Sequence, residues 1–306
     1  MPRPLLPGFN PFRQVTAREV VYLYLLMAFL SGAGINGLQQ LTGLAAADPF
    51  WTSIRYISLM VPLAGGLLWR IEMTGGKRQF VLGKLPRRTR WSRLFGLTIA
   101  TLVTSLGSFM LFAYLWYSLN PDSITKLVDG MTQLKSSLRP TDSVLPGISR
   151  ALTFFTLIIA APLTEEVIFR GILLQRWATK WNTPIALLLT SALFGILHLN
   201  FIGAGILGLV AGVLYYQTKS LWAPVALHAI NNTIASLSLV LPANVQKTST
   251  PEQFEQIFGQ GWTGLIWLAV ALPWVVIFLR KNWPRKHALI PYELNQSAAV
   301  MTADSV

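Results

Sequence analysis

The feature of this sequence that most constrains its fold is a series of long apolar segments. A helix that spans a lipid bilayer needs about 20 consecutive, mostly apolar residues. Eight segments of this kind follow one another, of which the second, fifth and sixth are shorter than the rest. They are Glu19–Gln40, Ser53–Trp69, Leu94–Leu119, Gly147–Leu163, Thr183–Leu199, Phe201–Gln217, Leu221–Leu241 and Gly261–Leu279. The pattern predicts an all-α, polytopic membrane bundle of about eight transmembrane helices, the fourth continuing as a polar-faced helix to Trp181.

The composition supports a membrane protein. Only 12% of the residues are charged, which is about half the fraction found in soluble domains. The hydrophobic fraction is 53% and the mean hydropathy is +0.49. The chain has no cysteine, which excludes both disulfide bonds and thiolate metal sites.

The basic residues of the loops predict the orientation of the bundle. The net charge is +13, but the Lys and Arg residues lie beside apolar spans, so their position implies no nucleic-acid partner. The loop after the second span holds eight basic residues against Glu72 alone, whereas the loop 121–149 is balanced in charge. Every basic cluster lies on one side if all eight segments cross and both termini are cytoplasmic. We therefore expect a multi-pass integral protein, located in the plasma (inner) membrane if the source is a bacterium.

The first span has an alternative reading as a secretory signal peptide. Ala45, Ala46 and Ala47 imitate an A-x-A cleavage site. The apolar run is too long, and too far from these alanines, for the usual signal arrangement. We expect the first span to remain uncleaved.

Ionisable residues at membrane depth are costly and point to function. The first set is Glu165, Glu166 and Arg170. Two glutamates could simply begin a juxtamembrane helix, since acidic residues stabilise a helix N-terminus. However, Glu166 and Arg170 stand at i and i+4 in the favourable order for an ion pair. Glu165 projects about 100° away around the helix and is left available for another task.

The second and third sets contain histidine. The segment 181–184 reads as a turn between two helices, so an antiparallel hairpin places His198 level with Glu165. His228 and Asn232 share one face of the seventh span because they stand at i and i+4. The structural alternative for His198 is a hydrogen-bonded core histidine. For His228 and Asn232 it is hydrogen bonding between helices. We interpret Asn231, which points elsewhere, as a packing or supporting residue.

These side chains suit hydrolysis of an amide by activated water. A carboxylate beside a histidine can hold and deprotonate a water molecule. A histidine and an asparagine on one rigid face can donate hydrogen bonds to a tetrahedral oxyanion. The sequence contains neither a G-x-S-x-G nucleophile motif nor the H-E-x-x-H zinc motif. Zinc remains chemically possible because Glu165, His198 and His228 are acceptable ligands.

The ordered motifs resemble a known family. E-E-x-x-x-R (Glu165, Glu166, Arg170), F-x-x-x-H (Phe194, His198) and H-x-x-x-N (His228, Asn232) are similar to those of the CPBP intramembrane proteases. This family is related to the type II CAAX prenyl endopeptidases and includes bacteriocin-processing and immunity proteins. The resemblance covers about Ile148–Leu241.

The resemblance implies an eight-helix bundle with a conical cavity that opens to the cytoplasmic side. It implies that Glu165 and His198 activate water and that His228 and Asn232 form an oxyanion hole. Glu166 and Arg170, with Phe194, would support that site. The family has been described both as metal-dependent and as glutamate-dependent. We favour the metal-free version, with no cofactor, because Asn232 is a poor zinc ligand and a good hydrogen-bond donor.

The resemblance also suggests a division of the chain. We expect an N-terminal three-helix membrane region with a basic cytoplasmic loop (1–146), a catalytic helix core (147–241), and a last transmembrane helix with a polar cytoplasmic tail (242–306). The tail after Pro291 is polar and is expected to be disordered. Gly205, Gly208 and Gly212 form a stripe of small residues that predicts close helix packing.

Three functions were weighed. The favoured one is an intramembrane endopeptidase that cleaves a membrane-associated, lipidated or CAAX-like substrate within the lipid bilayer. The second is a non-catalytic immunity or scaffold protein of the same fold; loss of a motif residue would favour it, and none is lost. The third is a transporter with a buried proton relay, for which the sequence lacks paired repeats.

Overall fold

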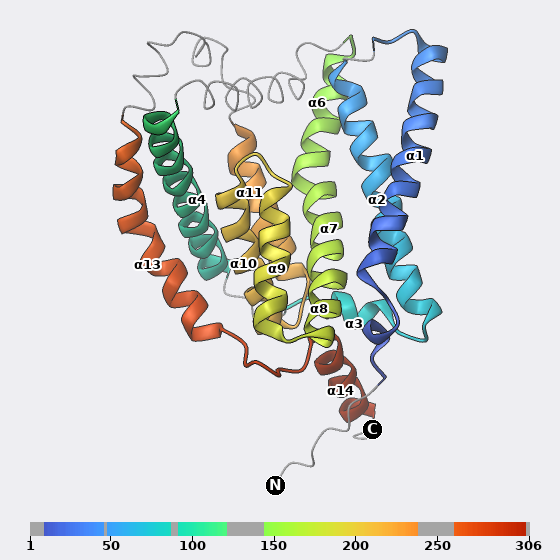
Figure 1. Ribbon diagram of the computed structural model, residues 1–306. Helices are drawn as coiled ribbons and strands as arrows, with labels where there is room; N and C mark the ends of the chain where they lie inside the picture. The colour runs from blue at the N-terminus through green and yellow to red at the C-terminus, as the bar shows by residue number, and fades with distance from the viewer. Residues whose placement is uncertain (1–8, 46–47, 87–90, 121–143, 238–259, 304–306) are drawn as a thin grey trace.

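A computed structural model describes residues 9–45, 48–86, 91–120, 144–237 and 260–303, and these ranges contain helices but no strand. The long helices, shown in Figure 1, are α1 (Ala17–Thr42), α2 (Pro49–Met73), α4 (Trp91–Leu119), the continuous helix Pro146–Lys180, α9 (Thr183–Ile196), α10 (Phe201–Thr218), α11 (Trp222–Ser236) and α13 (Gly264–Asn282). The short elements are single 3₁₀ turns at Pro11–Arg13 and Gly261–Thr263, α3 (Arg78–Leu82) and α14 (Pro291–Ala303). The prediction of a polytopic helical bundle is confirmed.

Each predicted apolar segment contains a helix where the structure describes it, although α9 ends at Ile196 and Leu197–Leu199, with His198, follow it as non-helical backbone. Within the described ranges, six helices are long and apolar enough to cross a membrane. The two others, α9 and α11, have 14 and 15 residues. At about 1.5 Å per residue they are only about 21–22 Å long, which is less than the roughly 30 Å of bilayer hydrocarbon. The end of the predicted seventh span and most of the loop 121–149 lie outside the described residues, so eight crossings remain a prediction.

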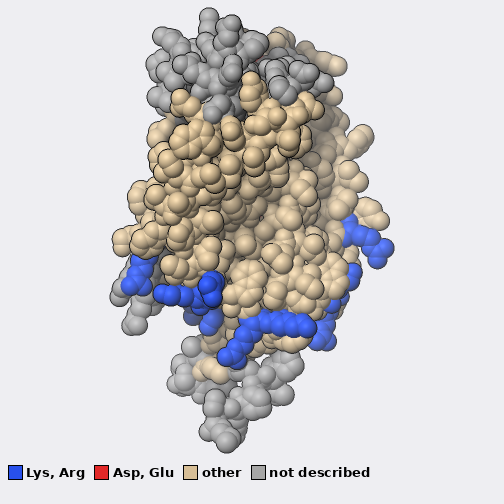
Figure 2. Space-filling view, turned by 60° about the vertical axis from the view of Figure 1, so that its left-hand side comes forward, with Lys and Arg blue, Asp and Glu red and all other residues tan. Residues whose placement is uncertain are grey.

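The helices are arranged around the central helix Pro146–Lys180. In Figure 1, α1 and α2 lie on one side of it, and α4 and α13 lie on the other. The helices α9, α10 and α11 lie between the central helix and the pair α4 and α13. Both chain ends lie at the same end of the bundle. Figure 2 shows that Lys and Arg side chains gather in a belt near that end, below a long surface without them. This distribution matches the charge asymmetry expected of a membrane protein.

The hairpins are defined by local capping signals. Thr16 and Glu19 form a capping box that begins α1, and Glu19 also accepts a 2.9 Å hydrogen bond from Arg70 at the end of α2. Asn182 caps α9 by accepting a hydrogen bond from the backbone N–H of Ile185. The predicted turn at 181–184 is therefore confirmed, and it returns the chain antiparallel to the central helix.

The glycine stripe of α10 packs closely against its neighbours, as predicted. A Cβ atom added to Gly212 would lie 2.6 Å from Leu187, and one added to Gly208 would lie 3.2 Å from the Cα atom of Ser191. Gly205 is less crowded, because its added Cβ would meet only the Ser191 carbonyl oxygen at 3.6 Å. The stripe thus lets α9 and α10 approach each other closely.

The prediction of a disordered tail after Pro291 was wrong, because residues 291–303 form α14. Its Tyr292 is buried and packs edge to face against Phe12 and Phe80. The Tyr292 N–H donates to Gln175 Oε1 at 2.8 Å, and burial raises the pKa of the Tyr292 phenol. Asn295 donates to two backbone carbonyls. A few anchoring side chains in a polar sequence therefore hold α14 against the basic end of the bundle.

Candidate active site

The two glutamates lie in the middle of a 35-residue helix, Pro146–Lys180. They end α7 (Ala161–Glu166), which is flanked by π-helical segments at Thr156–Ala160 and Val167–Leu174 and followed by α8 (Gln175–Lys180). The reading of these residues as a helix start is therefore wrong. The predicted continuation of the fourth span is confirmed, since the helix runs on to Lys180. Every residue from Val167 to Leu174 is buried. Single π turns often occur at functional sites.

Pro162 gives a local reason for the first π segment. There the Ala161 N–H bonds to the Thr156 carbonyl, five residues back. In that register the next donor would be the N–H of residue 162, which proline lacks. The Leu157 carbonyl therefore loses its helical partner, and Asn232 Nδ2 donates to it at 2.9 Å. This hydrogen bond joins α11 to the central helix just before the glutamates.

Glu166 is a buried carboxylate with two donors. Its Oε1 atom accepts a hydrogen bond from Arg170 Nη1 at 2.8 Å and another from His228 Nδ1 at 3.0 Å. Glu166 is 0% exposed and Arg170 is 1% exposed. The predicted ion pair is confirmed, and it also fixes the orientation of His228.

Glu165 projects in a different direction, as the helix geometry predicted. Its Oε1 atom accepts a 2.7 Å hydrogen bond from the hydroxyl of Tyr56 on α2. Its buried Oε2 atom has no hydrogen-bond partner among the described residues. Tyr56 was missed by sequence reasoning, since a tyrosine in an apolar helix more than 100 residues upstream carries no distinguishing signal. It also lies outside the predicted core 147–241.

The two histidines face the Oε2 atom of Glu165. The Nε2 atom of His198 lies 3.8 Å from it, and the Nε2 atom of His228 lies 3.9 Å from it. The His198 Nδ1 atom is 2.6 Å from the carbonyl oxygen of Phe194, which can only accept, so Nδ1 carries the proton. In a neutral ring, Nε2 then has a lone pair directed to Glu165. The matched depth predicted for His198 and Glu165 is thus observed.

Phe194 holds the charged groups together from the apolar side. Its ring centroid lies 4.5 Å from that of His198 and 5.7 Å from that of His228. The guanidinium carbon of Arg170 lies 4.5 Å from the same centroid, which is cation–π distance. Close contact between α9 and α10 at Gly208 completes the wall around Arg170.

Asn232 forms hydrogen bonds with residues outside the cluster of glutamates and histidines. Its two hydrogen bonds run to the Leu157 carbonyl and from Asn231, whose Nδ2 lies 3.3 Å from the Asn232 Oδ1 atom. Asn231 therefore supports Asn232, in line with the secondary role expected for it. The oxyanion role of Asn232 stays a prediction.

The same geometry is a loose fit for a zinc ion. Zinc bonds of about 2.0 Å in a tetrahedron place neighbouring ligand atoms about 3.3 Å apart. Glu165 Oε2 is 3.8 and 3.9 Å from the two imidazole nitrogens. Among the described residues no three His, Asp or Glu side chains are grouped as a metal site. The two separations also exceed the length of a direct hydrogen bond. Nevertheless, both Nδ1 atoms are engaged, which is how zinc-binding histidines are commonly oriented.

Comparison with known proteins gives a family for this part of the chain. Residues 147–234 match the family model "Type II CAAX prenyl endopeptidase Rce1-like". This match covers less than a third of the chain, and the matched residues, the Rce1-like core, resemble that family. That core contains both glutamates, Arg170, Phe194, both histidines and Asn232, so the resemblance read from the motifs is confirmed. Tyr56 lies outside it.

Two curated relatives match over 104 residues each. A Bacillus subtilis (strain 168) protein named "Putative membrane peptidase YdiL" is 30% identical, over 33% of this chain and 43% of its own length. An "Uncharacterized 24.3 kDa protein" of Escherichia coli is 33% identical, over 31% of this chain and 47% of its own length. The chain thus spans less than half the length of the curated relatives it matches. No solved structure matches. The apolar helices are those of a multi-pass membrane protein, and residues 147–234 resemble a family of membrane endopeptidases.

Proposed function

We propose that the chain is an intramembrane endopeptidase that hydrolyses a peptide bond of a membrane-associated substrate with water activated by Glu165 and His198. The observation that carries the proposal is the position of the Glu165 Oε2 atom between the Nε2 atoms of two histidines. The names of the matching family and of the Bacillus subtilis relative support the same chemistry.

In this mechanism Glu165 is the general base. Tyr56 occupies its Oε1 atom and leaves Oε2 to accept a hydrogen bond from water. The Nε2 lone pair of His198 orients the same water. As the water oxygen attacks the peptide carbonyl carbon, Glu165 takes its proton. Glu165 then delivers that proton to the leaving nitrogen as the C–N bond breaks, which returns the carboxylate to its starting state.

His228 is the proposed donor to the oxyanion of the tetrahedral intermediate. Its Nδ1–H is held by Glu166, so Nε2 donates when the ring is an imidazolium. The buried carboxylate of Glu166 stabilises that positive charge, and Arg170 limits the stabilisation by sharing the same oxygen. Asn232 uses one Nδ2 hydrogen on the Leu157 carbonyl, and its second hydrogen is the one assigned to the oxyanion. Loss of one such donor costs about 10²–10³ in rate.

A zinc-dependent version of the same peptidase is the second candidate. It is favoured by the engaged Nδ1 atoms of both histidines. Glu165, His198 and His228 would hold the ion, which would supply a Lewis acid and an acidified water. Glu166 and Phe194 would then act by orienting the two imidazoles.

The proposed setting is a bilayer with the basic end of the bundle, and both chain ends, at the cytoplasm. In a bacterium this is the inner membrane, with the site reached from the cytoplasmic side. A lipidated, CAAX-like substrate is the proposed class because of the matched family description. A non-catalytic scaffold of the same fold is the alternative.

The experiment that tests this proposal uses purified full-length protein in liposomes. One arm contains a peptide with a C-terminal prenylated cysteine, a second contains the same peptide without the lipid, and a third contains a peptide carrying a transmembrane helix. Cleavage is read by mass spectrometry of the products, beside a His198→Gln variant. Cleavage by the wild type alone supports the peptidase, and the preferred arm identifies the substrate class. Binding of all three without cleavage would favour the scaffold.

A further inference from the structure

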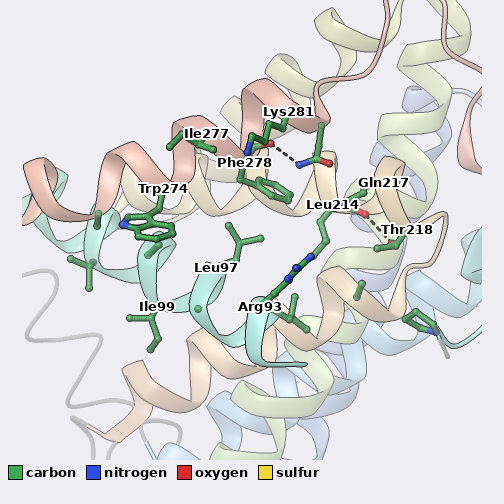
Figure 3. A pocket seen from close by; sticks show the side chains of 18 of the residues that line it. Arg93, Leu97, Ile99, Leu214, Gln217, Thr218, Trp274, Ile277, Phe278 and Lys281 are labelled. Carbon is green, nitrogen blue, oxygen red and sulfur yellow. Dashed lines mark hydrogen bonds between the residues drawn. The ribbon is translucent and has the colours of Figure 1, made fainter. Parts of the chain in front are cut away.

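A large cleft lies away from the candidate active site. It has a volume of about 1300 Å³ and lies between α4, the end of α10 and α13. Figure 3 shows its walls, with Leu97 and Ile99 on α4 and Trp274, Ile277 and Phe278 on α13. None of the residues proposed for catalysis lines it. Its size exceeds the roughly 300–1,000 Å³ of small-molecule pockets.

The cleft is shaped by close helix packing at one end. A Cβ atom added to Gly107 on α4 would lie 2.9 Å from the carbonyl oxygen of Gly264 on α13. The two backbones therefore touch near the end of the bundle that lies away from the chain termini. Arg93, at the start of α4, and Lys281, at the end of α13, line the cleft at the basic end of the bundle.

The polarity of the cleft changes along its length. Its polar and basic lining residues lie at the basic end, where α4 begins and α10 and α13 end; they are Arg93, Gln217, Thr218, Lys281 and Asn282. Apolar residues continue from there to Val103 on α4 and Val270 on α13. Those stretches are ten and eleven residues long, about 15–16 Å of helix, which matches the chain region of one leaflet.

The charged residues that line the cleft are all basic. Arg93 and Lys281 line it, and no Asp or Glu is among its lining residues. Figure 3 shows the Arg93 side chain extending into the cleft toward Leu214. Basic pockets between membrane helices at the cytoplasmic surface recognise anionic lipid headgroups. Apolar walls one leaflet deep with a basic mouth match a phospholipid in both shape and charge.

We propose that this cleft binds an anionic phospholipid from the leaflet at the basic end of the bundle. The headgroup phosphate lies at Arg93 and Lys281, and an acyl chain lies between α4 and α13 against Leu97, Ala100 and Trp274. This lipid is a resident ligand of the fold rather than a substrate, so the proposal does not depend on the peptidase chemistry.

The test is lipid binding to purified full-length protein in detergent, read by native mass spectrometry. The probes are phosphatidylglycerol, phosphatidylcholine with matched chains, and inorganic phosphate. We expect phosphatidylglycerol to bind at least about tenfold more tightly than phosphatidylcholine, because each basic residue adds attraction to an anionic headgroup. Inorganic phosphate should not displace it.

Two variants and one matched control separate this cleft from general surface charge. Arg93→Gln with Lys281→Gln should weaken phosphatidylglycerol binding about tenfold or more. Arg280→Gln with Arg285→Gln removes the same charge from exposed residues beside the cleft and should leave the affinity unchanged. Ala100→Trp should block the acyl chain while keeping every charge. All four charge changes are at exposed positions, so they should leave the fold intact.

Four results would overturn the proposal. Equal affinity for the two phospholipids would mean ordinary boundary lipid. Equal weakening by the control pair would mean general surface attraction, and displacement by inorganic phosphate would mean an anion site without an acyl chain. If Ala100→Trp instead converts a dimer to a monomer at unchanged lipid affinity, the cleft is an interface between two copies.

Discussion

The hydroxyl of Tyr56 donates a 2.7 Å hydrogen bond to the Oε1 atom of Glu165. This contact joins α2, from the N-terminal part of the chain, to the centre of the Rce1-like core. It also divides the two carboxylate oxygens, because one is held by the protein and the other faces both histidines. The first prediction follows from that division.

Replacing Tyr56 with phenylalanine should reduce activity without unfolding the protein. A hydrogen bond to a charged group contributes about 1.5–3 kcal/mol, so kcat/KM should fall about ten- to hundredfold. Tyr22→Phe is the matched control, because Tyr22 is 65% exposed on α1. Peptide cleavage by the two variants is compared with wild type. Full activity of Tyr56→Phe would mean that Glu165 needs no such support.

Removing Arg170 should destabilise the fold. Arg170→Ala leaves the carboxylate of Glu166 buried with His228 as its remaining partner, and breaking a buried pair costs about 3–5 kcal/mol. Arg280→Ala on exposed α13 should cost little. Adding Glu166→Gln to Arg170→Ala should recover part of the loss, because the uncompensated charge is then gone. Unfolding in detergent is the readout, and similar stability of Arg170→Ala and Arg280→Ala would refute the buried ion pair.

The glycines of α10 provide a graded test of packing beside Arg170. A methyl group at Gly208 would lie 3.1 Å from Arg170 Nη2 and 3.2 Å from the Cα atom of Ser191. Gly208→Ala should therefore cost about 1–3 kcal/mol. Gly205→Ala meets only an ordinary 3.6 Å contact and should be neutral or slightly stabilising, since alanine favours helix. Equal effects of the two substitutions on thermal stability would contradict the described packing.

A single substitution should detach helix α14 from the rest of the bundle. Tyr292 is 1% exposed and makes aromatic contacts with Phe12 and Phe80. Tyr292→Ala should therefore increase hydrogen exchange throughout 291–303, whereas Val300→Ala, at a residue 57% exposed, should not. Unchanged protection in Tyr292→Ala would show that the polar contacts of Asn295 and Glu293 hold α14 without the ring.

Sequence spacing predicted much of this arrangement, for identifiable reasons. The i, i+4 pair of Glu166 and Arg170 and the level positions of Glu165 and His198 follow from helix geometry alone. Contacts between distant helices do not. Tyr56 reaches Glu165 across 109 positions, and nothing local marks it. Asn232 donates to the Leu157 carbonyl because Pro162 leaves that carbonyl without a partner in the central helix.

The C-terminal region shows a different limit. A polar composition after Pro291 predicts disorder when only the average is considered. Two apolar residues that flank Pro291, Ile290 and Tyr292, are 3% and 1% exposed. Two well-placed side chains were enough to dock a helix that composition does not predict.

The most direct test of the central claim is cleavage of a membrane-anchored peptide by wild-type protein and by Glu165→Gln, each with and without a strong zinc chelator. The substitution keeps the shape of the side chain and its hydrogen bond from Tyr56, but removes the base. We predict that the wild type cleaves with or without chelator and that Glu165→Gln loses about 10²–10⁴ in rate. Full activity of Glu165→Gln would contradict the mechanism, and activity abolished by chelator and restored by zinc would assign Glu165, His198 and His228 to a metal ion instead.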